Sequence, residues 1–201
     1  MTPRYTELQL DALRELANIA SGNAATSLSR MLSREVDLSV PRVLALPLAD
    51  AVDACGSADE DITGVVIPLQ GDIHGVVLLL ISPEGAATLC RLLGVEPQSD
   101  LGESALREIG NVLGTSCLNA LASMTGLQLE PRPPHVTTDM LGAIVSSLAL
   151  AHTASTELVL VLDSELEVSN EPCSISFVLL PTGGGVTDLL KPLGLAETTA
   201  S

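Results

Sequence analysis

The sequence predicts an α+β fold in which two pseudo-symmetric halves share one mainly antiparallel sheet, with two long helices on one face. Two observations support this prediction. Residues 11–41 and 104–134 align without a gap at a shift of 93 positions. Each copy is followed by apolar runs and a short helical segment in the same order. A pattern that recurs at a fixed shift indicates one structural unit written twice.

The elements of the first half follow from local patterns. The long helix is succeeded by a strand and then by residues 50–59, which are polar and predict a loop. Two apolar runs, residues 61–69 and 73–81, flank Gln70-Gly71-Asp72 and predict a hairpin. A short helix is expected over residues 83–93, because Gly94 is a helix-ending residue.

The second half repeats this order. Its long helix and strand are followed by an amphipathic helix, two strands and a short C-terminal helix, expected at residues 139–152, 157–166, 173–180 and 185–193. A half of this size buries too little apolar surface to be stable alone. We therefore interpret residues 1–98 and 99–201 as two repeats within a single domain that spans residues 1–201.

Composition excludes several classes of function. The 201 residues include 25 acidic and 9 basic side chains, giving a net charge of −16. Nucleic-acid binding requires clustered Lys and Arg, so no nucleic-acid partner is expected. The two aromatic residues, Tyr5 and Phe177, provide no stacking platform for bases. The longest apolar runs, such as residues 75–81, are too short to span a bilayer, so no membrane association is expected.

The cysteines and the N-terminus indicate a cytoplasmic protein. Cys55, Cys90, Cys117 and Cys173 form no CxxC pair and lie at no metal-ligand spacing from a histidine, so we interpret all four as reduced and structural. The first residues are polar and contain no apolar signal core.

Each long helix presents one polar face with a glutamate and an asparagine one turn apart. On a helical wheel, Glu15 and Asn18 lie opposite the apolar stripe of the first helix, and Glu108 and Asn111 do the same in the second. Many surrounding residues differ between the copies, whereas this pair is retained at the same spacing. The sequence therefore predicts two exposed functional surfaces.

These residues resemble the signature of the CheC, CheX and FliY phosphatases. The shared pattern is Asp or Ser, three residues, Glu, two residues, Asn, twenty-two residues and Pro. It occurs twice, at Asp11, Glu15, Asn18 and Pro41 and at Ser104, Glu108, Asn111 and Pro134. The resemblance implies a CheC-like chemotaxis phosphatase that hydrolyses the aspartyl phosphate of a CheY-like response regulator. CheX-like members of the family carry one pair and dimerise, so two pairs in one chain imply a monomer.

The resemblance also implies a role for each residue. Asn18 and Asn111 orient the attacking water, and Glu15 and Glu108 pair with the regulator's active-site lysine. Mg²⁺ comes from the regulator, and no cofactor of this chain's own is expected. In the family, the region of residues 139–152 is associated with binding CheD, a receptor deamidase. The alternative is a non-catalytic module that sequesters phosphorylated regulator or modulates a CheD-type deamidase.

Overall fold

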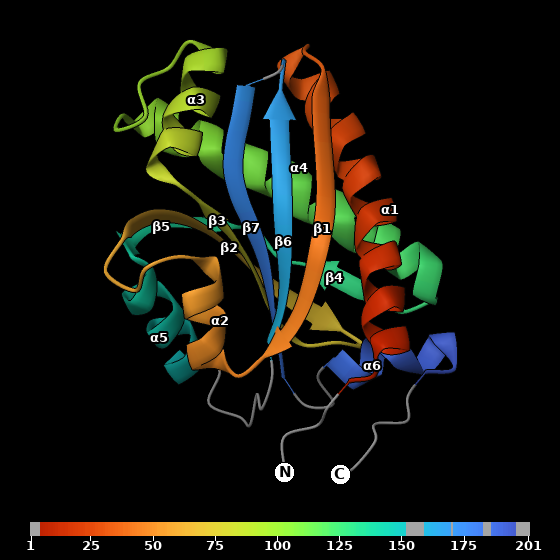
Figure 1. The fold of residues 1–201 in the computed structure, drawn as a ribbon. Coiled ribbons are helices and arrows are strands. Elements are labelled where there is room, and N and C mark those ends of the chain that lie inside the picture. Colours follow the sequence, from red (N-terminus) through yellow and green to blue (C-terminus); the bar gives the residue numbers. More distant parts are fainter. Residues whose placement is uncertain (1–4, 152–158, 170, 183–185, 196–201) are drawn as a thin grey trace.

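The computed structural model describes residues 5–151, 159–169, 171–182 and 186–195. Its centre is a seven-stranded antiparallel sheet with the order β1-β6-β7-β3-β2-β4, in which β5 also pairs with β2 (Figure 1). The helices are α1 to α6, at Glu7–Leu32, Leu48–Cys55, Pro83–Leu93, Asp100–Thr125, Leu141–Ala151 and Val186–Leu190, followed by the 3₁₀ turn Lys191–Leu193. The strands are β1 to β7, at Val36–Leu46, Asp61–Gly71, Gly75–Ile81, Leu129–Pro131, His135–Met140, Val159–Val168 and Glu171–Pro181. These elements confirm the predicted α+β fold.

The two repeats interleave in the sheet. β1 of the first half pairs with β6 of the second, and β2 of the first half pairs with β4 and β5 of the second. The hairpins β2–β3 and β6–β7 meet where β3 pairs with β7, at the middle of the sheet. The halves therefore share one sheet, with an approximate two-fold axis between β3 and β7.

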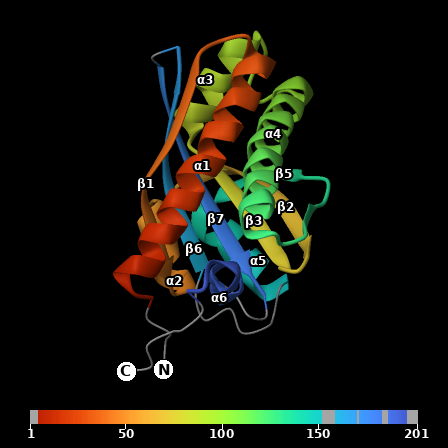
Figure 2. The same cartoon turned by 90° about the vertical axis from the view of Figure 1, so that its right-hand side faces the viewer.

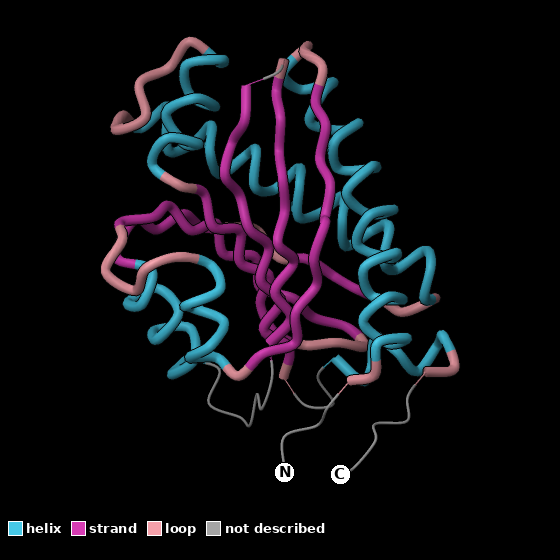
Figure 3. The backbone as a smooth tube through the Cα atoms, in the orientation of Figure 1, coloured by secondary structure: helices cyan, strands magenta, loops and turns pink. Residues whose placement is uncertain are grey.

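Helices cover both faces of the sheet. On one face, α1 and α4 pack with α3 and α6 over a core that includes Leu28, Ile67 and Leu113. On the other face, α2 and α5 cover a smaller cluster that includes Leu78 and Ile144. Figure 3 shows these helices on either side of the strands. The two long helices share one face, as predicted.

The expected loop at residues 50–59 is wrong for its first part, which is helical in α2. Leu48, Ala51, Val52 and Cys55 fall at the helical spacing of three and four residues, and they pack on the second face of the sheet. Intervening aspartates hide this short apolar stripe in the sequence. The predicted helix at residues 139–152 is confirmed from Leu141 to Ala151 as α5, but its predicted start is wrong, because Asp139 and Met140 belong to β5.

The strand after the second long helix is divided in two. In the first half β1 is continuous, with a register shift between Ser39 and Arg42. In the second half, β4 ends at Pro131 and β5 begins at His135. Pro133 and Pro134 lie in this gap, and proline has no N–H to donate to a sheet. The proline run therefore explains the interruption.

The other predicted short elements agree closely with the structure, except that β2 continues through Gln70 and Gly71 and β3 begins at Gly75, so the hairpin turn lies at residues 72–74. The helix predicted at residues 83–93 is α3, with Ser82 as its N-cap and Gly94 as its C-cap at φ 70°. The predicted limits at residues 152, 157 and 185 lie outside the described residues. Within the described part of the chain, we find no helix with the length and hydropathy required to traverse a bilayer.

Candidate functional site

The candidate site lies on the two long helices, which are side by side and run in roughly opposite directions (Figure 2). Each helix begins at a side-chain cap. Thr6 accepts a hydrogen bond from the Gln9 N–H at the start of α1, and Ser99 accepts one from the Gly102 N–H at the start of α4. The Ser116 hydroxyl of α4 donates to the Ser27 hydroxyl of α1 at 3.0 Å, so the helices also contact each other through polar groups.

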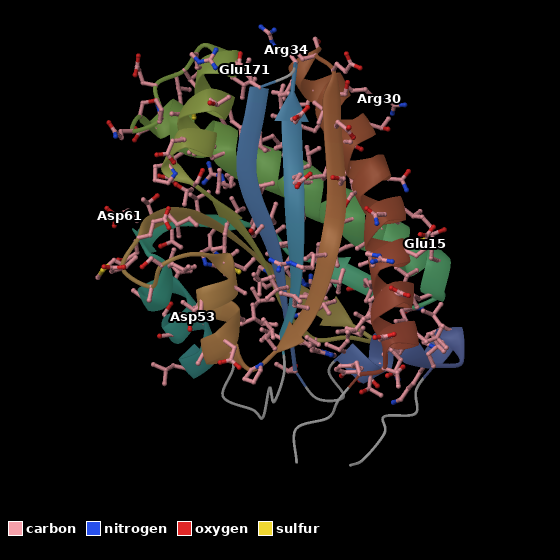
Figure 4. The ribbon with its side chains drawn as sticks, viewed as in Figure 1. Glu15, Arg30, Arg34, Asp53, Asp61 and Glu171 are labelled. Atoms are coloured by element: carbon pink, nitrogen blue, oxygen red, sulfur yellow. The ribbon has the colours of Figure 1, made fainter. Side chains whose placement is uncertain are left out.

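Each helix separates an apolar stripe from a polar one. The predicted core-facing residues Leu13, Ala17 and Leu28 of α1 are buried, as are Leu106 and Leu113 of α4. Glu15 and Glu108 are exposed on the other side. In Figure 4, Glu15 lies on the side of α1 that faces away from β1. The two glutamates are therefore accessible to another protein.

Neither glutamate has a partner among the residues that the structure describes, because the arginines beside them are engaged elsewhere. The guanidinium of Arg14 pairs with Asp11 at 3.0 Å. The guanidinium of Arg107 lies 3.9 Å from the Glu103 carboxylate and donates to the Ser104 hydroxyl at 3.1 Å. The free carboxylates of Glu15 and Glu108 can accept a cationic group from outside.

Asn18 is positioned by a strand. Its side chain is half-buried, and its Oδ1 accepts a hydrogen bond from the backbone N–H of Val40 in β1 at 2.9 Å. Val40 lies where the register between β1 and β6 shifts, which leaves its N–H for this bond. Asn18 is predicted to be exposed, and in the structure it is only partly so, because one face of the amide rests against β1.

Asn111 is also half-buried, but its partner is different. Its Oδ1 accepts a hydrogen bond from the hydroxyl of Thr115, one turn further along α4, at 3.3 Å. The residue equivalent to Val40 in the second half is Pro133, which has no N–H. Sequence reasoning missed both partners, although the exchange of Val40 for Pro133 is visible in the repeat.

The surroundings of the two sites suit close approach by a protein. A side chain added at Gly22, one turn beyond Asn18, would meet no atom within 4 Å, so this position is open to solvent. A cavity of about 470 Å³ lies between α3, the segment of residues 97–99 and the start of α4, and none of the four site residues lines it. The Glu and Asn pairs therefore occupy an outer helical surface.

Two glycines of α4 lie so close to the sheet that neither position has room for a side chain. A Cβ added at Gly110 would lie 2.6 Å from Cγ1 of Val65 in β2, and one added at Gly114 would lie 2.2 Å from Cδ1 of Ile67. The positions equivalent to Gly110 and Gly114 in α1 are Ala17 and Ser21. The two glycines therefore allow α4 to approach β2.

None of the four cysteines, all of which the structure describes, forms a disulfide. Burial raises the pKa of Cys117, on the inner side of α4, to about 12. Burial also raises the pKa of Cys90 and of Cys173. These thiols are neutral at physiological pH and serve as small apolar groups, which agrees with a structural role.

Comparison with known proteins agrees with the repeat. The sequence model of the CheC-like family matches residues 8–44 and 101–137, and each stretch contains one Glu and Asn pair. The chain is 35% identical over 168 residues to the CheY-P phosphatase CheC of Bacillus subtilis, and the alignment covers 80% of each chain.

Two solved structures have a similar fold. The crystal structure of Thermotoga maritima FliY superimposes with a TM-score of 0.77 at 20% identity, covering 96% of this chain and 98% of the other. A second match is a structure of a CheX–CheY–BeF3–Mg²⁺ complex from Borrelia burgdorferi. Its TM-score is 0.50 at 14% identity, and the match covers 82% of this chain and 96% of the other.

Proposed function

This chain belongs to the CheC-like family, and we propose that it is a phosphatase that hydrolyses the aspartyl phosphate of a CheY-like response regulator. The observation that carries this proposal is the Glu and Asn pair, which occurs once on each long helix with its carboxylate free and its amide held by a hydrogen bond. Each pair lies on an exposed outer helical surface, which another protein can reach, so the arrangement suits a protein substrate.

Asn18 and Asn111 are the water-orienting groups. Hydrolysis of a phosphoryl group passes through a loose transition state, so catalysis depends on holding water in line more than on a strong base. A carboxamide oxygen has two lone pairs, and the hydrogen bond from Val40 uses one at Asn18. The second lone pair can accept a hydrogen bond from water while the amide plane stays fixed. A neutral amide also avoids repelling the phosphoryl anion.

Glu15 and Glu108 are the docking groups. A carboxylate placed against a phosphoryl anion would be repelled, which disfavours a role as general base. An exposed carboxylate without an intramolecular partner is suited to pair with a lysine ammonium of the regulator. This pairing would place the asparagine, one turn further along the helix, in the regulator's active site.

Mg²⁺ would be supplied by the regulator. Mg²⁺ requires a near-octahedral set of oxygen ligands and is often bound through substrate phosphates and one or two carboxylates. Each site of this chain offers one carboxylate and one amide, which is too few to hold the ion without a partner. The residues present therefore fit a protein that acts on a metal-bearing substrate, and we propose no cofactor for this chain alone.

The assay that tests the function is single-turnover hydrolysis of a phosphorylated CheY-like regulator in the presence of Mg²⁺. Changing both asparagines, Asn18→Ala with Asn111→Ala, should lower the rate by at least roughly 100-fold, because water is no longer aligned. Affinity for the regulator should remain nearly unchanged. Each single variant should retain part of the activity. Full activity of the double variant would reject the mechanism and favour the alternative, a module that only sequesters the regulator.

Further proposals concern the assembly and location of the protein. We propose a monomer, because one chain contains both sites, and light scattering at several concentrations would test this. We propose a cytoplasmic location, which the absence of a disulfide among the four described cysteines supports. A CheD-type deamidase is a candidate second partner in the region of residues 139–152, where Met140 is 47% exposed. Loss of deamidase binding in Met140→Ala would support that partner, and unchanged binding would exclude this contact.

A further inference from the structure

Two exposed leucines occupy equivalent positions in the two halves. Leu8 of α1 is 65% exposed and Leu101 of α4 is 70% exposed. Leu101 is the equivalent of Leu8 in the repeat, and each is the second residue of its helix. A single exposed leucine needs no explanation. Two at the same place in both repeats indicate that the position serves a purpose on the surface.

Both leucines lie in line with the glutamate of their site, and the asparagine lies to one side of this line. Glu15 follows Leu8 by seven residues, close to two helical turns, and Ile19 follows it by eleven, close to three. Ile19 is 45% exposed. Glu15 therefore lies between two exposed aliphatic side chains. Val112, the equivalent of Ile19, is half-exposed and follows Leu101 at the same interval.

These side chains fit within one protein contact. Ten residues separate Leu8 from Asn18, which corresponds to about 15 Å along a helix. An ordinary protein interface buries about 800 Å² on each partner, so a regulator seated on Glu15 and Asn18 would also cover Leu8. Buried apolar anchors close to a charged pair provide much of the affinity in such interfaces.

The charges around each leucine define what can cover it. Glu7 and Asp11 are exposed beside Leu8, and Asp100 is exposed beside Leu101. An apolar spot with an acidic rim is complementary to an apolar spot with a basic rim. This is the same polarity as the proposed pairing of Glu15 and Glu108 with a lysine of the regulator.

We propose that Leu8 and Leu101 are apolar anchors for the regulator, each extending one catalytic surface by two turns toward the start of its helix. This inference rests on the proposed function. Both leucines contribute to docking and neither acts in the chemical step. Affinity should therefore depend on them, whereas the rate of hydrolysis within the complex should not.

The test compares Leu8→Ala with Leu101→Ala, made together, against Leu150→Ala. Leu150 is equally exposed but lies on α5, away from both sites. The double variant should raise KM roughly tenfold, as expected for truncating a leucine that is buried at an interface, with kcat unchanged. Binding of a regulator that carries beryllium fluoride and Mg²⁺ should weaken by the same factor. Leu150→Ala should match the wild type in both measurements.

The possible outcomes distinguish the docking role of the two leucines from the proposed phosphatase activity. Wild-type KM and affinity in the double alanine variant would overturn the anchor while leaving the asparagine-dependent hydrolysis intact. A fall in kcat without a change in affinity would also overturn it. If the wild type binds the beryllium fluoride form but hydrolyses nothing, the proposed function fails, and the binding comparison still decides the anchor. Leu8→Met with Leu101→Met keeps the apolar area and should restore affinity, which excludes misfolding as the cause.

Discussion

Asn18 and Asn111 have the same sequence spacing but are held in different ways. Asn18 is bound by a backbone N–H that belongs to a strand of the sheet. Asn111 is bound by the Thr115 hydroxyl on its own helix, at a longer distance. A peptide N–H in a sheet has a fixed direction, whereas a hydroxyl can rotate. The first amide is therefore held more firmly than the second.

Between the two halves, the glutamate and asparagine are retained, whereas the groups that hold the asparagine differ. Val40 is replaced by Pro133, and Gly22 is replaced by Thr115. Each half lacks the donor that the other half uses. The two helices also pack differently, since α4 reaches β2 through Gly110 whereas α1 has Ala17 at the same place. Substitutions at these positions can test each part of the comparison.

The largest effect is expected on stability from Gly110→Ala. The new Cβ would lie 2.6 Å from Val65, and overpacking of this kind costs roughly 1–3 kcal/mol, offset by about 1 kcal/mol of helix propensity. We expect the free energy of unfolding in urea to fall by up to about 2 kcal/mol. Gly22→Ala is the matched control, because its Cβ would meet nothing, and it should stabilise the protein slightly. Equal stability of the two variants would contradict the close packing of α4.

The next largest effect is expected from Val40→Pro, which introduces into the first half the proline that the second half has at the equivalent position, Pro133. In an Asn111→Ala background only Asn18 acts, and removing the N–H should lower the single-turnover rate roughly two- to tenfold, the value of one hydrogen bond. Val40 lies at the register shift, so the ladder with β6 should survive. Val40→Ala keeps the N–H and controls for lost packing. Equal rates in the two variants would show that the hydrogen bond does not position Asn18.

A smaller effect is expected from Thr115→Val in an Asn18→Ala background. The substitution removes the hydroxyl that contacts Asn111 but keeps a similar shape. Because that hydroxyl is less firmly fixed than a peptide N–H, the rate should fall less than about threefold, at the low end for a hydrogen bond. A loss as large as that in Val40→Pro would mean that the two supports are equivalent.

The smallest effect on function is expected at Cys117 of α4. Its equivalent in α1 is Ala24. The raised pKa of Cys117 keeps the thiol neutral at pH 8, so iodoacetamide should modify it slowly in the folded protein and rapidly in urea. Between pH 9 and 12 the unfolded thiol ionises first, so the free energy of unfolding should decrease with pH. Cys117→Ala should reduce this decrease. Fast labelling of the folded protein, followed by mass spectrometry, would contradict the burial of this thiol.

Much of this architecture can be predicted from the sequence, because the elements predicted in one half can be compared with those predicted in the other. The limits of α3 follow from Pro83 and Gly94, and the buried stripes of α1 and α4 follow from helical spacing. α2 was missed because its apolar stripe is short and is interrupted by acidic residues. The positions of Glu15 and Glu108 on the outer surface were also predictable.

The supports of the asparagines were not predictable from local patterns. Val40 is far from Asn18 in the sequence, and its N–H is available only because β1 shifts register there. The half-buried state of Asn18 likewise depends on how closely β1 lies beside α1. Such contacts arise from tertiary packing, which helical spacing alone does not describe.

The interleaved sheet has a consequence for synthesis of the protein on the ribosome. β1 is synthesised before β6, its partner in the sheet, so the ladder between Val36 and Val168 forms only after β6 has been made. During this interval the nascent chain carries an apolar strand with an open edge, which is prone to pairing with other chains. Contacts so distant in the sequence also slow folding, because long loops must close before the contacts form. β6 must therefore be synthesised through residue 168 before β1 can pair with its native neighbour along its whole length.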